Sequence, residues 1–170
     1  MRKLKIALAS RIKGGKIAVL GIGSELRGDD AAGMLAAAQL KNWNTNRSVK
    51  VFLGATAPEN LTSEIKKFGP KHLIIIDSAD IGKEAGAVDI IDPEKIGGIS
   101  FSTHSLPLKM IVEYLRAHVS GEIIIIGIQQ KSLTFGSPPS EEVERSVKGV
   151  CDTIKELIEK DIYERTNSSI

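Results

Sequence analysis

Two adjacent carboxylates follow a glycine-rich segment near the start of the chain. The segment reads GIGSELRGDDAAG over residues 21–33, and Asp29 and Asp30 stand where a helix is expected to begin. A dinucleotide-binding fingerprint would need glycine in place of Leu26, and a phosphate-binding loop would need lysine directly after Gly28. Two carboxylates repel a phosphate and attract a cation. Acids are also common at helix starts as caps or as partners of the helix dipole, which is the alternative interpretation.

A third carboxylate, Asp77, follows the apolar run HLIII at residues 72–76. We expect this run to be a buried strand with Asp77 at its carboxyl end, where ligands collect in open α/β sheets. A carboxylate there is partly buried and needs a partner, because an unpaired buried charge is costly. A neighbouring backbone amide would satisfy it equally. Asp80 lies further into the loop, and we interpret it as an ordinary turn residue.

The third candidate is His104, which precedes a predicted helix in the segment STHSLPL at residues 102–108. A histidine at a helix N-terminus is disfavoured as a cation but suited to be a neutral metal ligand. An exposed loop histidine is the alternative. The other two histidines fit structural roles better, because His72 opens a strand at its amino end and His118 lies in the last turn of a helix.

One acid of the pair, Asp77 and His104 would together form a mixed site of two carboxylates and one imidazole. Such a set can bind zinc, nickel, iron or manganese, with positions open for water. The single cysteine, Cys151, is not near these segments in the sequence, so a structural zinc site is not expected. Open coordination indicates Lewis-acid hydrolysis or binding of a substrate's metal. Residue types alone decide neither which metal binds nor whether it belongs to this protein or to its substrate.

The elements that position these residues are apolar runs alternating with amphipathic segments. The fourth of the expected strands is the weakest and fits a sheet edge. We expect strands at 16–22, 49–53, 72–76, 87–91 and 122–128. We expect helices at 30–43, 58–68, 106–119 and 139–163. Residues 1–13 either form a short extra helix ended by Gly14 and Gly15 or are loose. The alternation indicates a three-layer α/β domain with a mostly parallel sheet.

Length and composition bound the class of protein. The 170 residues fit a single domain, 1–170, with an N-terminal extension over 1–15 and a polar tail over 164–170 that we expect to be frayed. The net charge of +2 gives no electrostatic argument for nucleic-acid binding. No apolar run reaches the length of a membrane span, and the short run at 6–9 is interrupted too soon for a signal peptide. We therefore expect a cytoplasmic monomer that neither binds nucleic acid nor inserts into membranes.

The combination of segments resembles the hydrogenase maturation proteases. The opening GIGSELRGDDAAG is similar to the family motif G-x-G-N-x-L-x-x-D-D/E-x-x-G. The likeness continues through GATAPEN, HLIIIDSADIG, GAVDIIDPEKI, STHSLPL and EIIIIGIQ. It covers about residues 16–150. The APEN and THSLPL segments look closest to the branch that serves formate-hydrogenlyase-type (hydrogenase-3-type) hydrogenases.

The resemblance implies a fold, a site and a reaction. The family fold is a three-layer α/β/α sandwich with a five-stranded, mostly parallel sheet and one antiparallel strand, for which 87–91 is the natural candidate. Carried over position by position, the family's ligands are Asp30, Asp77 and His104, so the resemblance selects Asp30 over Asp29. The implied activity is an endopeptidase that removes the C-terminal extension of a [NiFe] hydrogenase large-subunit precursor. The same three residues would bind the nickel already present in that precursor and serve catalysis.

Two positions depart from the family pattern. Ser24 stands where the family usually has asparagine, and Leu53 stands where many members carry an aspartate, so a role for that acid does not carry over. Two other functions stay open. One is a general metallopeptidase with its own zinc, against which the scarcity of further ligands argues. The other is a binding protein that checks for nickel without cutting.

Overall fold

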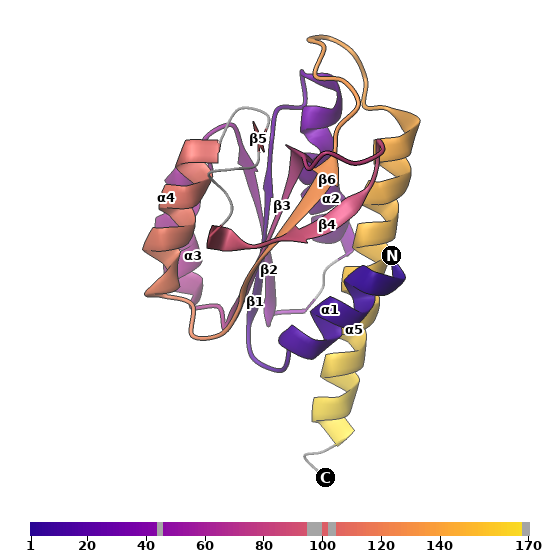
Figure 1. Ribbon diagram of the computed structural model, residues 1–170. Coiled ribbons are helices and arrows are strands. Elements are labelled where there is room, and N and C mark those ends of the chain that lie inside the picture. The colour runs from indigo at the N-terminus through magenta and orange to yellow at the C-terminus, as the bar shows by residue number, and fades with distance from the viewer. Residues whose placement is uncertain (44–45, 95–99, 102–104, 168–170) are drawn as a thin grey trace.

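Helices on both faces of a central sheet make up the computed structural model, which describes residues 1–43, 46–94, 100–101 and 105–167 (Figure 1). The strands are β1 (Ile17–Ile22), β2 (Val49–Ala55), β3 (His72–Asp80), β4 (Val88–Ile91), β5 (Ser100–Phe101) and β6 (Ile123–Gln129). The helices are α1 (Arg2–Arg11), α2 (Ala32–Trp43), α3 (Thr62–Phe68), α4 (Ser105–Arg116) and α5 (Glu141–Asn167), with two 3₁₀ turns, η1 (Gly28–Ala31) and η2 (Pro58–Leu61).

The strands follow the order β2-β1-β3-β6-β4. Strands β1, β2, β3 and β6 run parallel, and β4 pairs antiparallel with β6 at one edge. The predicted fold is therefore confirmed, including the weak fourth strand as the antiparallel edge. Strand β5, which the sequence did not predict, adds two residues antiparallel to the end of β3.

Two apolar layers enclose the sheet, because successive strand residues point to opposite faces. On β3, Ile74 and Ile76 pack in the core that includes α1, α2 and α5. Leu73 and Ile75 pack in the core that includes α3 and α4. Figure 1 shows the same division, with α3 and α4 on one side of the sheet and α1, α2 and α5 on the other. Continuous apolar runs are what strands buried on both faces require.

Strand β3 is longer than the sequence suggested. The prediction ended it at Ile76, whereas the strand continues to Asp80. It continues because β6 pairs with it as far as Ala79 and β5 pairs with its last two residues. Asp77 therefore lies inside a strand rather than after it, and this part of the prediction was wrong.

The terminal helices also extend the sequence picture. The first residues form α1, the first of the two alternatives, and its two leucines are buried among residues of the α2–α5 core. Gly14 and Gly15 follow with φ of 61° and 83°, a backbone conformation that favours glycine. At the other end, α5 continues to Asn167, beyond the predicted end at Tyr163. In the described part of the chain, none of the helices is both long and apolar enough to cross a membrane.

Candidate functional site

The glycines around β1 and α2 let backbone segments approach closely at one end of the sheet. A Cβ on Gly33, in the first turn of α2, would lie 2.1 Å from the carbonyl oxygen of Ile76 and 2.3 Å from that of Ile22. A Cβ on Gly23, whose φ is 129°, would lie 1.8 Å from the carbonyl oxygen of Asp30. Neither position has room for a side chain. The glycines thus bring η1 and its carboxylates against the ends of β1 and β3.

Asp29 binds the loop of residues 130–140, which follows β6. Its Oδ2 accepts the backbone N–H groups of Lys131 at 2.7 Å and Ser132 at 3.0 Å, and its Oδ1 accepts that of Ser140 at 2.6 Å. Burial raises the pKa of Asp29, but the three N–H donors outweigh burial and lower the pKa below its ordinary value. Asp29 therefore holds this loop to η1, which the helix-cap interpretation of the sequence did not foresee.

Asp30 lies beside β3 and is completely buried. Its Oδ2 accepts the backbone N–H of Ser24 at 3.1 Å, and its Oδ1 accepts the hydroxyl of Ser78 at 3.3 Å. The contact from residue 24 comes from the backbone, so the replacement of the family's asparagine by serine leaves this hydrogen bond possible. The two carboxylates of η1 are thus distinguished by their contacts, one to the loop and one to the sheet.

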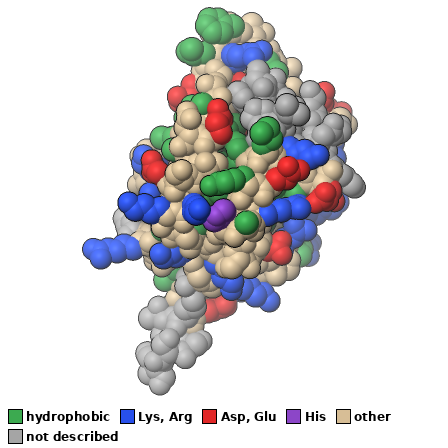
Figure 2. Space-filling view, turned by 90° about the vertical axis from the view of Figure 1, so that its left-hand side faces the viewer, with side chains coloured by type: hydrophobic (Ala, Val, Ile, Leu, Met, Phe, Trp, Pro, Cys, Tyr) green, Lys and Arg blue, Asp and Glu red, His purple; other side chains and the backbone are tan. Residues whose placement is uncertain are grey.

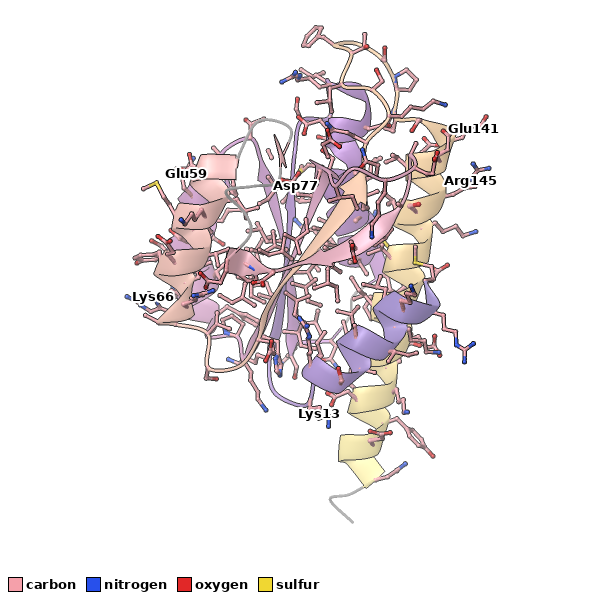
Figure 3. The ribbon with its side chains drawn as sticks, in the orientation of Figure 1. Lys13, Glu59, Lys66, Asp77, Glu141 and Arg145 are labelled. Atoms are coloured by element: carbon pink, nitrogen blue, oxygen red, sulfur yellow. The ribbon has the colours of Figure 1, made fainter. Side chains whose placement is uncertain are left out.

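Asp77 is completely buried near the upper end of the sheet in Figure 3. Strand alternation directs it, like Leu73 and Ile75, toward the α3–α4 face. Neither of its carboxylate oxygens has a hydrogen-bond partner among the described residues. Burial first, and the charge of Asp30 second, raise the pKa of Asp77 well above its usual value. The nearby backbone N–H of Ser78 does not meet hydrogen-bond geometry and lowers this pKa only in part.

The third predicted residue, His104, lies outside the described residues. Helix α4 begins at Ser105, directly after it, and packs on the face of the sheet toward which Asp77 points. Within the described ranges, no group of three histidine, cysteine, aspartate or glutamate side chains is placed to hold a metal. The structure therefore brings Asp30 and Asp77 together, and the participation of His104 stays a prediction.

The two other histidines have structural partners. The ring of His72 is buried, and its Nδ1 accepts the N–H of Glu122 at 3.2 Å. Its Nε2 lies 3.4 Å from the backbone nitrogen of Lys13 and 3.3 Å from the carbonyl oxygen of the same residue. His118 lies just after α4, where its Nδ1 is 3.1 Å from the carbonyl oxygen of Tyr114 and its ring lies 5.2 Å from the Tyr114 ring.

Two further residues, Ser78 and Leu53, can be interpreted only with the structure. Sequence reasoning did not select Ser78, although alternation along a longer β3 would have directed it toward α2 and hence toward Asp30. Leu53, which replaces the acid of many family members, lies on the edge strand β2 with an exposed side chain. This chain therefore presents no carboxylate at that place. The site therefore holds a buried carboxylate pair in which Asp77 is unsatisfied by the part of the chain that the structure describes. Such a pair suits a cation or a shared proton.

Comparisons with known proteins agree on one family. The family model described as hydrogenase maturation protease matches residues 34–157. A Methanocaldococcus jannaschii protein that carries the name of a hydrogenase maturation protease is 40% identical over 152 residues, which span 85% of this chain and 89% of that protein. The hydrogenase 3 maturation protease of Escherichia coli K12 is 34% identical over 138 residues, covering 78% of this chain and 84% of the relative. The crystal structure of the [NiFe] hydrogenase maturation protease HycI from Thermococcus kodakarensis superposes with a TM-score of 0.81 at 30% identity, covering 92% and 99% of the two chains.

Proposed function

Because the chain belongs to the hydrogenase maturation protease family, we propose that it removes the C-terminal extension from the large-subunit precursor of a [NiFe] hydrogenase after nickel has been inserted. The nickel arrives in the precursor and is part of the substrate. Asp30, Asp77 and His104 bind it and thereby distinguish loaded from empty precursor. We expect this to take place in the cytoplasm, with the protease acting as a monomer.

The unsatisfied carboxylate of Asp77 is the observation that supports this proposal most directly. A buried carboxylate without a hydrogen-bond partner among the described residues, next to a second carboxylate, is costly unless a cation or a proton joins it. Burial and the charge of Asp30 raise the pKa of Asp77, which favours the protonated carboxyl when no cation is bound. A divalent cation displaces that proton and turns both carboxylates into ligands. Two oxygen ligands and one imidazole suit nickel.

The site then carries out hydrolysis with few parts. Asp30 is positioned by the Ser24 N–H and the Ser78 hydroxyl, so its carboxylate does not need to reorient when the cation enters. The nickel of the precursor polarises the scissile carbonyl and lowers the pKa of a nearby water. That water attacks the carbonyl carbon, the peptide C–N bond breaks, and the proton that the water gives up passes to the leaving amine. No serine or cysteine nucleophile is required.

Processing of purified precursor tests the proposal. Wild-type protein, Asp30→Asn and His104→Ala are each incubated with nickel-loaded precursor, and the mass of the large subunit is measured before and after. The wild type is expected to remove the extension. Both variants are expected to lose processing by at least about a hundredfold, because changing even the hydrogen-bond partners of metal ligands costs about 10–100-fold. Asp152→Asn, at an exposed position, and His118→Ala, at a half-buried position after α4, are matched controls and are expected to retain wild-type rates.

Three further outcomes separate this function from its alternatives. Cleavage of nickel-free precursor at the same rate would contradict nickel as the recognition mark. Hydrolysis of unrelated peptides by zinc-loaded protein would favour a general metallopeptidase. Tight binding of loaded precursor with no change in its mass would favour a nickel checkpoint that does not cut.

A further inference from the structure

Two loops next to the candidate site hold apolar side chains out into solvent. Leu26, between β1 and η1, and Phe135, in the loop of residues 130–140, are 62% and 75% exposed. We call these two residues the apolar tip. Figure 1 shows the 130–140 loop rising above the upper ends of the strands. Figure 2 shows hydrophobic side chains projecting from the same upper end of the molecule. Exposed apolar groups gathered at one place mark an interaction site more often than scattered ones do.

Hydrogen bonds join the two loops into one unit. The N–H of Gly136 donates to the carbonyl oxygen of Leu26 at 2.8 Å, and the N–H of Gly28 donates to the carbonyl oxygen of Ser137 at 3.1 Å. The carboxylate of Asp29 holds both ends of the 130–140 loop through its three backbone contacts. Because the backbone is already fixed, little loop entropy is lost when the tip binds a partner.

The apolar tip is also continuous with the candidate site. The N–H of Leu26 lies 3.4 Å from the Ser24 hydroxyl oxygen, and the N–H of Ser24 donates to Asp30. Leu26 is thus four residues from Asp30 along the chain, on the solvent side of η1. A large protein that brings a metal to Asp30 and Asp77 therefore also contacts the apolar tip.

We propose that the apolar tip docks into a concave apolar surface on the folded body of the hydrogenase large-subunit precursor, an inference that rests on the proposed function. The shape selects the folded body over the C-terminal extension. The tip projects outward, and a projecting group fits a depression in a folded partner, whereas an extended peptide needs a groove to receive it. An aromatic side chain on a fixed backbone is typical of the few residues that dominate protein–protein binding.

Kinetics of Phe135→Ser and of the double variant Leu26→Ser/Phe135→Ser on nickel-loaded precursor test the inference. We expect KM to rise about tenfold or more for the double variant, a change that corresponds to about 1.4 kcal/mol of lost binding. We expect kcat to stay within about twofold of wild type, because the tip does not touch the reacting atoms. Tyr163→Ser, which removes a 69% exposed aromatic side chain from the opposite end of α5, is expected to leave both constants unchanged. Equal melting temperatures for all variants show that folding is intact.

A direct measurement of precursor binding distinguishes failure of this inference from failure of the proposed function. Binding of the double variant to nickel-free precursor, which is not expected to be cleaved, should be at least about tenfold weaker than that of wild type. If the double variant has a normal KM and binds the precursor normally, the proposal that the apolar tip docks on the precursor is wrong, and the proposed peptidase function is unaffected. A lower kcat with an unchanged KM also overturns it, since the loops would then act on the site and not on docking. If wild type cuts no precursor, the peptidase proposal fails, and the binding comparison alone decides whether the tip docks.

Discussion

Asp77→Asn removes a buried charge while it keeps the shape of the side chain. The native carboxyl is completely buried beside Asp30 and has no hydrogen-bond partner among the described residues, so at neutral pH it is either an unpaired anion or holds a proton at a cost. The amide is always neutral, so the variant removes the charge repulsion between residue 77 and Asp30. We therefore expect the variant to be more stable than wild type and at the same time inactive in processing.

The size of the effect follows from the burial. A buried polar group without a partner costs about 1–3 kcal/mol, and a charged group costs more. The amide removes the cost of the charge but keeps the cost of a buried polar group, so a net stabilisation of about 2 kcal/mol is expected at pH 7. In a protein of this size each kcal/mol shifts the melting temperature by roughly 2–4 °C. The expected rise is therefore roughly 4–8 °C.

The pH dependence has a definite sign. The pKa of Asp77 is raised in the folded protein, so the folded state binds this proton more tightly than the unfolded state does. Below the unfolded pKa of about 4, the carboxyl is neutral in both states and its penalty is absent. As the pH rises above that value, the penalty grows until the folded pKa is passed. The difference in melting temperature between Asp77→Asn and wild type should therefore be small near pH 4 and large near pH 7.

Thermal unfolding of both proteins from pH 4 to pH 8 measures this difference. Asp152→Asn, an equivalent change at an exposed position of α5, controls for the loss of one negative charge and is expected to leave the melting temperature within about 1 °C. A melting temperature of Asp77→Asn at or below that of wild type at pH 7 would refute the reasoning. So would a stability gain that shrinks as the pH rises.

Two further changes probe the elements that position the site. Asp29→Asn should destabilise the fold by about 2–4 kcal/mol in urea titrations, because the amide replaces an acceptor of three backbone N–H groups; an unchanged midpoint would show that the loop contacts do not matter. Gly33→Ala should cost about 3 kcal/mol or more, since its Cβ meets the carbonyl oxygens of Ile76 and Ile22. Gly149→Ala in α5 is its matched control and should instead stabilise by up to about 1 kcal/mol, because the nearest atoms to the new Cβ belong to the flexible side chain of Met1, which can move aside. Equal effects of the two glycine changes would contradict the close-packing argument.

Local patterns in the sequence were enough for most of the fold. The apolar runs at β1, β3 and β6 predicted buried strands, because a strand covered on both faces needs apolar side chains on both faces. The weak run at 87–91 predicted the edge strand β4 for the converse reason, since an edge strand is only partly covered. Residue types also placed two carboxylates and a histidine near strand ends, and the likeness of several motifs to one family supplied the nickel and the precursor.

The different roles of Asp29 and Asp30 were decided by the tertiary structure. As adjacent acids at a helix start they are equivalent by type, and only resemblance chose between them. The partners that separate them lie far away in the sequence, at Lys131 to Ser140 for Asp29 and at Ser78 for Asp30. The burial of Asp77 likewise depends on strands β5 and β6, which lengthen β3. Hydrophobic periodicity in the sequence encodes which segments form strands and helices. Contacts between residues far apart in the sequence depend on how those segments pack. For that reason only the folded chain shows how the two carboxylates differ in their hydrogen-bond partners.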